Sequence, residues 1–497
     1  MRKATIPLLL SISMALGVAL GVGLSNKRQS SSRPEWQKID EILRYVKEDY
    51  VDTISQKTLE EEVIAYLLQR LDPHSYYITQ ENVAEMNEPL DGGFQGIGIQ
   101  FNVKSDTIYV IKVIANGPSE KAGIQAGDQI ISADTTLLAG GHLSTNEIMA
   151  YLKGESGTSV AVGILRNGQK LSIEIERAEI PLSSIDAAYL LNDTTIYLKL
   201  ARFSKNTFDE FQSRVYPLKS TKTTDFILDL RGNGGGYLEA STRIADEFLK
   251  SGLLITYTEG KSRPRADVFA TDEGAFEGVR LSLIIDGYSA SASEILAGAM
   301  QDHGRATIFG KRSFGKGLVQ EQSEWADGSA TRLTVARYYT PNGRSIQRPY
   351  KSFDDERNYF GSPLDTSHQG GIVPDVETKR DTSGITWLYA ELVHGGLIND
   401  FVYDFRDSRL KELVLLSFPE FEKQFTDEFM LGELRKFLDQ RGFQINDSEW
   451  ARSGSKMAER CRAILARILF DDEAYFKIVN PSDETIRAIL SSIKKPK

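Results

Sequence analysis

Residues 225–236 read DFILDLRGNGGG, an apolar run typical of a buried strand followed by a glycine-rich loop. Residues 238–249 are predicted to form a helix directly after the loop. The pattern repeats where residues 281–285 predict a second buried strand and residues 289–293 lead into a helix over 295–301. This alternation predicts an α/β core whose glycine- and serine-rich loops lie between a strand end and a helix start. Catalytic groups collect at such positions in open α/β sheets.

The rest of the 497-residue chain divides around this core, which we place at residues 179–383. Apolar residues at helical spacing predict a small helical domain over residues 35–90. Residues 91–178 are rich in strand-like segments separated by turn signals, which predicts a compact β-rich module. The pattern is helical and charged over residues 384–497, which predicts a C-terminal helical domain without chemistry of its own. The predicted fold class is therefore α/β and multidomain.

The charge and the cysteine content argue against several classes of function. Asp and Glu outnumber Lys and Arg by 69 to 59, and the resulting net charge of −10 disfavours a nucleic-acid partner. Cys461 is the single cysteine, so the chain has no internal disulfide and no thiolate metal cluster. The five histidines are scattered without the spacing of a metal site. We therefore expect neither a metal nor another cofactor.

The N-terminus differs in kind from the body of the chain. Basic residues stand on both sides of a largely apolar run over residues 4–24. The length of this run suits a membrane span or a long signal peptide, and without a cysteine it cannot be a lipoprotein signal. We expect residues 1–28 to act as a retained inner-membrane anchor, with the body on the periplasmic side of the cell envelope. A cleaved signal, with the body secreted, is the alternative.

Residues 289–294 read SASASE and open an apolar helical run. Small residues at such a junction leave a hydroxyl exposed, and the free N–H groups of the helix start can stabilise an anion on a bound carbonyl. Ser291 is then a candidate nucleophile, with the N–H group of Ala292 as an oxyanion donor. The alternative is a helix cap, because serine at the cap with Glu294 in the first turn is common stabilising chemistry.

Lys316 is a candidate base for that hydroxyl. A serine hydroxyl needs a neighbour to take its proton, and a lysine can do so if burial shifts it toward the neutral amine. Lys316 lies between two glycines near apolar residues, and Gln320 follows four residues later, where it could hold the amine in place. The alternative is an exposed turn lysine. A phosphate-binding loop is disfavoured because Gly317 stands where that loop needs serine or threonine.

Two glycine-rich segments can present backbone N–H groups to a ligand. The run over residues 232–236 can complete an oxyanion hole with Ala292, although a tight turn has the same composition. Residues 96–99, GIGI, lie beside a predicted strand edge. Such a segment suits the C-terminal carboxylate of a peptide that adds as an extra strand. An ordinary glycine-rich strand is the alternative for this segment.

Taken together, the motifs resemble a known family. GIGI at 96–99, with the segment 118–128, is similar to a PDZ domain. Five further motifs resemble those of the carboxy-terminal processing (tail-specific) serine proteases. They are DLRGNGGG at 229–236, the SASASE cluster, QDHGRA at 301–306, FGKG at 314–317 and LDPHS at 71–75.

The resemblance implies a role for each matching residue. Ser291 is implied as the nucleophile, Lys316 as the general base and Gln320 as its positioning partner. The implied oxyanion donors are the N–H groups of Ala292 and, to within one position, Gly236. The implied peptide-binding residues of the PDZ domain are Gly96, Ile97, Gly98 and Ile99.

The same resemblance implies a ClpP/crotonase-like core and a serine endopeptidase that needs no cofactor and no metal. Its partners would be protein substrates with exposed, apolar C-termini, selected through the PDZ domain. An adaptor protein and a homo-oligomer are left open, and no nucleic acid is expected. The rival function is a membrane-tethered PDZ scaffold on an inactive protease core.

Overall fold

The computed structural model describes residues 14, 37–104, 106–114, 116–166, 168–350, 370–379, 382–413 and 415–493. The predicted membrane anchor over residues 4–24 lies outside the described residues, apart from Met14. Within the described ranges, no helix is long and apolar enough to cross a membrane. The chain forms two compact units, residues 1–68 and residues 69–497.

The described part of the first unit is helical. It holds α2 (Gln37–Asp49) and almost all of α3 (Gln56–Gln69). α2 buries no side chain, and in α3 Leu68 is buried. The apolar spacing predicts these helices correctly, but their apolar side chains, such as Ile42 and Tyr45, stay exposed.

A six-stranded sheet forms the centre of the second unit, in the order β10-β11-β12-β15-β16-β19. Its strands are β10 (Ile185–Asn192), β11 (Thr195–Leu200), β12 (Asp225–Asp229), β15 (Arg280–Ile285), β16 (Ala306–Gly310) and β19 (Val376–Glu377). β10 is antiparallel to β11, and the remaining neighbours are parallel. The continuous apolar runs of β12 and β15 follow from this position, because a parallel strand is covered on both faces.

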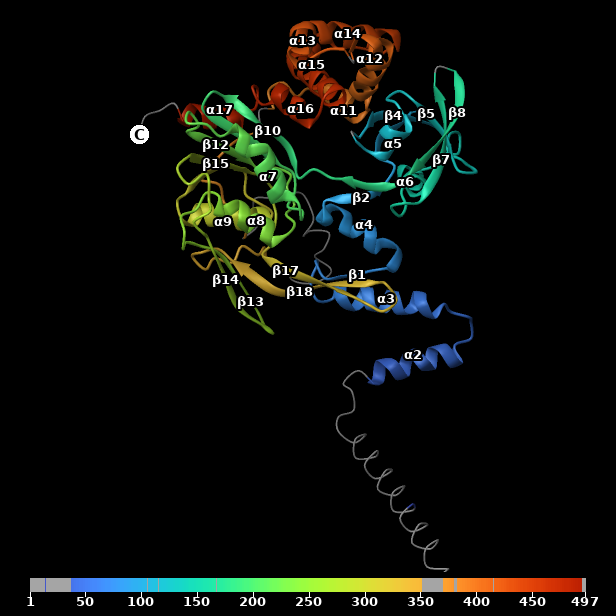
Figure 1. Cartoon of the computed structure of the whole chain (residues 1–497), viewed down its shortest axis with the longest axis vertical. Coiled ribbons are helices and arrows are strands. Elements are labelled where there is room, and N and C mark those ends of the chain that lie inside the picture. The colour runs from blue at the N-terminus through green and yellow to red at the C-terminus, as the bar shows by residue number, and fades with distance from the viewer. Residues whose placement is uncertain are drawn as a thin grey trace, which may run out of the picture. The chain divides into compact units, whose positions relative to one another are not determined.

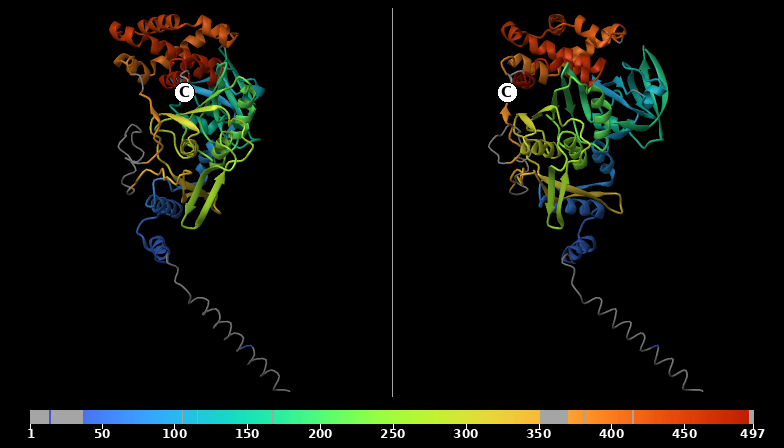
Figure 2. Two further views of the ribbon diagram at one scale, coloured as in Figure 1. Left: turned by 90° about the vertical axis from the view of Figure 1, so that its left-hand side faces the viewer. Right: turned by 60° about the vertical axis from the view of Figure 1, so that its left-hand side comes forward.

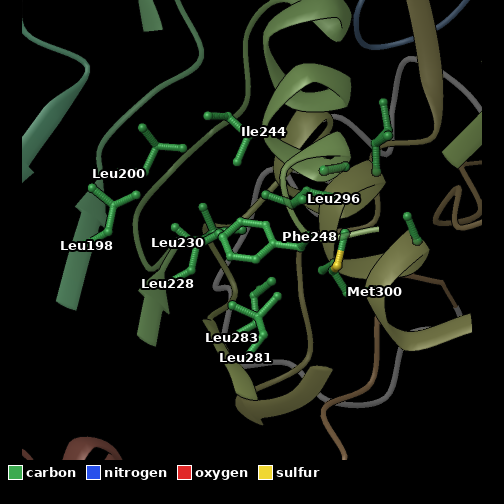
Figure 3. Close-up of a cluster of buried hydrophobic side chains, with 14 of the residues drawn as sticks. Leu198, Leu200, Leu228, Leu230, Ile244, Phe248, Leu281, Leu283, Leu296 and Met300 are labelled. Atoms are coloured by element: carbon green, nitrogen blue, oxygen red, sulfur yellow. The ribbon is translucent and has the colours of Figure 1, made fainter. Parts of the chain in front are cut away.

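One face of this sheet packs against α7 (Thr207–Val215), α8 (Leu238–Asp246) and α9 (Ala292–Asp302). Figure 3 shows Leu228 and Leu283 of the sheet among Phe248, Leu296 and Met300. The other face packs against Ile486 and Ile489 of α17 (Glu484–Ile493), which lies beside β10 and β12 in Figure 1. The strand ends therefore lead into the helices that carry the candidate nucleophile and the glycine loop.

A second sheet of the core brings a distant segment to the same region. Its order is β1-β18-β13-β14, with β17 paired to β18. These strands are β1 (Tyr76–Ile78), β13 (Leu254–Gly260), β14 (Arg263–Phe269), β17 (Leu318–Glu324) and β18 (Ala330–Tyr339). In the views of Figure 2 the β13–β14 hairpin extends from the core as a long arm. β1 carries residues just after the LDPHS motif onto β18, next to the strand that holds Gln320.

The β-rich module forms a sheet of its own, in the order β3-β4-β5-β7-β8 with β6 beside β5. The elements are β3 (Ile99–Lys104), β4 (Thr107–Val113), α5 (Pro118–Ala122), β5 (Gln129–Ala133), β6 (Thr136–Leu137), α6 (Thr145–Leu152), β7 (Ser159–Arg166) and β8 (Gln169–Glu176). Val110, Val162 and Ile164 are central to its separate core. A two-stranded ribbon of β2 (Gly93–Gly96) and β9 (Ala178–Pro181) stands at its entry and exit, and α4 (Gln80–Asp91) precedes it.

The C-terminal segment is helical. It contains α11 (Trp387–His394), α12 (Leu397–Leu413), α13 (Phe418–Gln424), α14 (Asp427–Gln440), α15 (Asp447–Leu469), α16 (Asp472–Val479) and α17. Leu434, Met457 and Cys461 lie in its own buried cluster. Cys461 is fully buried, and burial raises the pKa of its thiol, so it packs as an apolar side chain.

Candidate active site

Three serines stand in the loop that leads into α9, and their surroundings differ. Ser289 Oγ donates to the carbonyl oxygen of Leu230 at 2.8 Å, and Ser293 Oγ donates to that of Asn233 at 2.9 Å. Both of these serines are fully buried, whereas Ser291 between them is partly exposed. The outer two hold the loop in place, and the middle serine is the one that a substrate can reach.

Ser291 has a strained backbone at the start of α9. Its φ of 55° and ψ of −112° fall in a region that residues other than glycine rarely occupy. Its N–H donates to Glu294 Oε2 at 2.8 Å, and its carbonyl oxygen accepts the Tyr338 hydroxyl at 3.0 Å. Tyr338 also hydrogen-bonds to the carbonyl oxygen of Lys316. Strain of this kind persists where surrounding groups hold the residue, as these two side chains do.

Glu294 connects the serine loop to the lysine loop. Its Oε2 accepts the N–H groups of Ser291 at 2.8 Å and of Lys316 at 2.9 Å. Its Oε1 accepts the N–H of Gly315 at 2.7 Å and the hydroxyl of Ser313 at 2.5 Å. Complete burial raises the pKa of Glu294 to about 7, although these hydrogen bonds act to lower it. One carboxylate thus fixes the backbones of Ser291 and Lys316 relative to each other.

The side chain of Gln320 holds the Lys316 amine, because Lys316 Nζ donates to Gln320 Oε1 at 2.7 Å. Burial lowers the pKa of Lys316, and the positive charge of Arg332 lowers it further. The carboxylates of Asp72 and Glu294 act in the opposite direction. The net shift of the Lys316 pKa is downward, toward the neutral amine that a general base requires.

Gln320 lies in β17, opposite Thr334 of β18, beside an irregularity in the strand register at Val319 and Gln320. Its Nε2 donates to the carbonyl oxygen of His74, while its Oε1 accepts from Lys316. The spacing of four residues therefore does bring Gln320 to the amine of Lys316. The contact with His74 joins Gln320 to a distant segment of the sequence, so the spacing of four residues could not predict it.

The glycine run lies against the serine loop through Asn233, which is fully buried. The carbonyl oxygen of Asn233 accepts the N–H of Ala290 at 3.0 Å, and its Oδ1 accepts the N–H of Gly235 at 2.9 Å. The Gly235 N–H is therefore already engaged. Over the described part of the chain, the N–H groups of Gly236 and Ala292 have no acceptor. This pattern favours Gly236 over Gly235 as the partner of Ala292 in an oxyanion hole.

Sequence reasoning missed several residues that build this region. Glu294 entered only through the alternative of a helix cap, Asn233 only as part of the glycine-rich run, and Tyr338 had no signal. The S-x-x-E spacing of Ser291 and Glu294 and the position of Asn233 between two glycines are visible in the sequence. Neither pattern shows that Glu294 and Asn233 are buried. The residues described contain no cluster of His, Cys, Asp and Glu side chains able to hold a metal ion.

Comparison with known proteins places these observations in a family. Residues 194–354 match Peptidase family S41, and residues 95–176 match the PDZ domain. The chain is 34% identical over 337 residues to the carboxy-terminal-processing protease of Bartonella bacilliformis, a match that covers 66% of this chain and 76% of that protein. This chain belongs to peptidase family S41.

Other relatives agree with this assignment. The chain is 31% identical over 328 residues to the carboxy-terminal processing protease CtpA of Bacillus subtilis, covering 65% of this chain and 69% of CtpA. It is 32% identical over 318 residues to CtpB of the same organism, covering 63% of this chain and 65% of CtpB. The chain is therefore a serine-type, carboxy-terminal processing peptidase with a PDZ domain. Residues 388–471 match a family of unknown function, DUF8443, so the C-terminal helices do have relatives, which sequence reasoning did not find.

The PDZ domain carries its predicted peptide-binding segment at one edge of its sheet. The four residues, Gly96, Ile97, Gly98 and Ile99, run from the end of β2 to the start of β3. β3 is the first strand of the sheet and pairs with β4. The carbonyl oxygens of Ile97 and Gly98 accept N–H groups from Ser119 and Ile114, each at 3.0 Å. Their own N–H groups have no acceptor within the described ranges, so a peptide carboxylate could take them.

Proposed function

We propose that this peptidase cleaves its substrates with a Ser291–Lys316 dyad, after the PDZ domain has bound the substrate's C-terminus. The observation that carries the proposal is the buried carboxylate of Glu294, which accepts the N–H groups of both dyad residues. Two further observations support it. Ser291 is partly exposed between two serines that are used structurally, and burial lowers the pKa of Lys316.

The chemistry proposed is acyl transfer. The neutral amine of Lys316 takes the proton of Ser291 Oγ, and Oγ attacks the scissile carbonyl carbon. The N–H groups of Gly236 and Ala292 stabilise the oxyanion that forms. The ammonium of Lys316 then gives its proton to the leaving amine as the C–N bond breaks, and a water deprotonated by the same amine hydrolyses the acyl-enzyme. Gln320 positions the amine throughout, and the reaction consumes no cofactor.

Substrate selection is proposed to occur at the edge strand β3. A substrate tail would extend the sheet as a further strand, with its terminal carboxylate on the N–H groups of Ile97 and Gly98. Ile99 and Phe101 of β3 are partly buried apolar side chains beside this edge. We therefore expect tails with apolar residues to be preferred over charged ones.

We further propose that residues 4–24 anchor the protein in the inner membrane with its body on the periplasmic side. The apolar run and its basic flanks support this placement. Protease digestion of intact spheroplasts tests it. The body should be degraded from outside, and a protected body would contradict the proposal.

The test of the dyad is cleavage of an unfolded protein with an apolar C-terminal tail by the purified full-length chain. The parent is expected to cleave, and both Ser291→Ala and Lys316→Ala to lose activity by about 10³-fold or more. Lys311→Ala is the matched control, because Lys311 lies in the same connection after β16 and is expected to be dispensable.

Four other outcomes have distinct meanings. Cleavage that survives Ser291→Ala would contradict the nucleophile, and equal losses in Lys316→Ala and Lys311→Ala would contradict the base. Tail binding without cleavage by the parent would favour a scaffold. Cleavage that requires a cell extract would point to an adaptor protein.

A further inference from the structure

The turn over residues 72–75 belongs to the LDPHS motif, and the reaction described above assigns it no role. Asp72 is buried, and its Oδ1 accepts the N–H groups of His74 and Ser75, each at 2.8 Å. Its Oδ2 accepts the hydroxyl of Ser75 at 2.7 Å. An aspartate that accepts hydrogen bonds from the residues following it fixes the path of the backbone there.

The same turn is attached to the hairpin that carries Gln320. The N–H of Thr334 donates to Ser75 Oγ at 3.1 Å, and the hydroxyl of Thr334 donates to Asp72 Oδ1 at 3.2 Å. Thr334 is the residue of β18 that stands opposite Gln320. Immediately after the turn, Tyr76 begins β1 and pairs with Arg332 of β18. The turn is thereby held on the hairpin at the level of Gln320.

This attachment determines which way the Gln320 carboxamide is turned. Its Nε2 donates to the carbonyl oxygen of His74, so its Oε1 is the atom left to face Lys316 Nζ, at 2.7 Å. The reversed amide would place its oxygen against the His74 carbonyl, which loses that hydrogen bond, and its NH₂ against the amine, where it would occupy the lone pair that has to accept the proton of Ser291. A neutral amine that donates one N–H to Oε1 has its lone pair directed elsewhere. The position of the His74 carbonyl thus keeps the Lys316 lone pair directed away from Gln320.

We propose that the Asp72–Ser75 turn is a positioning element of the catalytic dyad, with Asp72 holding the His74 carbonyl that orients Gln320 and, through it, Lys316. The inference rests on the proposed function, because it concerns the same lysine. It extends the site to a segment that lies more than two hundred residues before the dyad in the sequence.

The charges around Lys316 supply a way to separate this role from a purely structural one. The carboxylates of Asp72 and Glu294 raise the pKa of Lys316, whereas Arg332 lowers it. The imidazole of His74 is neutral at neutral pH, because burial and the nearby Lys316 lower the pKa of His74 to about 4, although Asp72 acts to raise it. At neutral pH the turn therefore presents one negative charge to the amine, that of Asp72.

The deciding variant is Asp72→Asn, measured in the full-length chain as kcat against pH on the tailed substrate. Asparagine keeps an oxygen for the N–H groups of His74 and Ser75, so the turn can persist, but it removes the charge. With less stabilisation of the ammonium, the pKa of Lys316 falls, and the acidic limb of the profile should move to lower pH by roughly half a unit or more. Asp72→Ala also removes the oxygen, and should in addition lower the plateau of kcat by about tenfold or more.

The matched control is Asp327→Asn at the far end of the same hairpin. Asp327 Oδ1 likewise accepts an N–H and a hydroxyl, both from Ser329, at 3.0 and 2.7 Å. It should leave the profile unchanged. An unshifted profile in Asp72→Asn, or an equal shift in both variants, would overturn the inference. Full activity of Lys316→Ala would instead overturn the proposed function, so the two failures are distinguishable. If Asp72→Ala does not fold, as thermal unfolding would reveal, Asp72→Asn still decides.

Discussion

The loops that carry Ser291 and Lys316 and the peptide-binding edge of the PDZ domain differ in what their backbone N–H groups do. Around the proposed dyad, the N–H groups of Ser291, Gly315 and Lys316 all donate to the buried carboxylate of Glu294. At the edge of the PDZ domain, the N–H groups of Ile97 and Gly98 have no acceptor among the residues described. The N–H groups that donate to Glu294 fix the two loops before substrate arrives, whereas those of Ile97 and Gly98, like those of Gly236 and Ala292, are left for the ligand to complete.

Glu294→Gln is the change expected to damage the fixed region most. Each carboxylate oxygen accepts two donors, so either orientation of the amide places its NH₂ against two of them. We expect the free energy of unfolding to fall by about 3 kcal/mol or more and kcat to fall about 10²-fold or more. Chemical denaturation and steady-state kinetics measure the two effects.

Glu420→Gln provides the control for that substitution. Ser417 and Glu420 form the same S-x-x-E capping pattern, but on an exposed helix start, where water can replace lost partners. This variant should keep kcat and leave the free energy of unfolding nearly unchanged. Equal effects of the two substitutions would contradict a special role for the buried glutamate.

Gly236→Ala should have the next largest effect. A Cβ on Gly236 would lie 1.9 Å from the carbonyl oxygen of Phe203, so the loop must move and take its N–H group with it. We expect kcat to fall by about 10²-fold, with a smaller change in KM, as for loss of one oxyanion donor. In Gly234→Ala the new Cβ meets nothing within 4 Å, so activity should be retained. Comparable kinetics in the two variants would exclude Gly236 as a donor.

Gly98→Ala tests the open region and should have the smallest effect of the three on chemistry. Gly98 has a φ of +73°, and an added Cβ would lie 2.9 Å from Ile180 Cδ1. We expect KM for a tailed protein to rise about tenfold, while kcat for a short tailless peptide stays the same. Gly168→Ala, with a φ of +81° and open space around it, shares the strain in a turn away from the groove. A rise in KM in both variants would mean that strain, rather than the groove, is responsible.

The core strands could be predicted because a strand that is buried on both faces has a continuous apolar run, which is visible in the sequence. The run over 225–230 forms β12 over Asp225–Asp229, and the run over 281–285 lies within β15. The helix predicted over 238–249 ends earlier, at Asp246 in α8, after which Phe248 and Leu249 continue the apolar pattern outside the helix. The spacing of apolar residues indicates which residues are buried. It does not indicate where a helix ends, because helix ends depend on other contacts.

The polar framework of the site could not be predicted, because it joins segments that are far apart in the sequence. The S-x-x-E pattern of Ser291 and Glu294 recurs at Ser144 and Glu147, where it is exposed. Local spacing predicts the cap in both places, and the burial that makes Glu294 a clamp comes from the chain around Ser313 and Lys316. The sequence likewise offers no physical reason to choose Ser291 among the three serines. The structure does, because the hydroxyls of Ser289 and Ser293 are hydrogen-bonded to backbone carbonyl oxygens.

The most direct test of the proposed dyad is the pH dependence of the first turnover, in which Ser291 would be acylated by a tailed substrate. The pKa of Lys316 is lowered from the ordinary value of 10.5, and the amine must be neutral to accept the proton of Ser291. The acylation rate should therefore rise with pH through a pKa below 10.5, and Lys316→Ala should abolish that rise together with the activity. A rate that is flat from about pH 5 to about pH 9 in the parent, or a rise that survives Lys316→Ala, would contradict a lysine base.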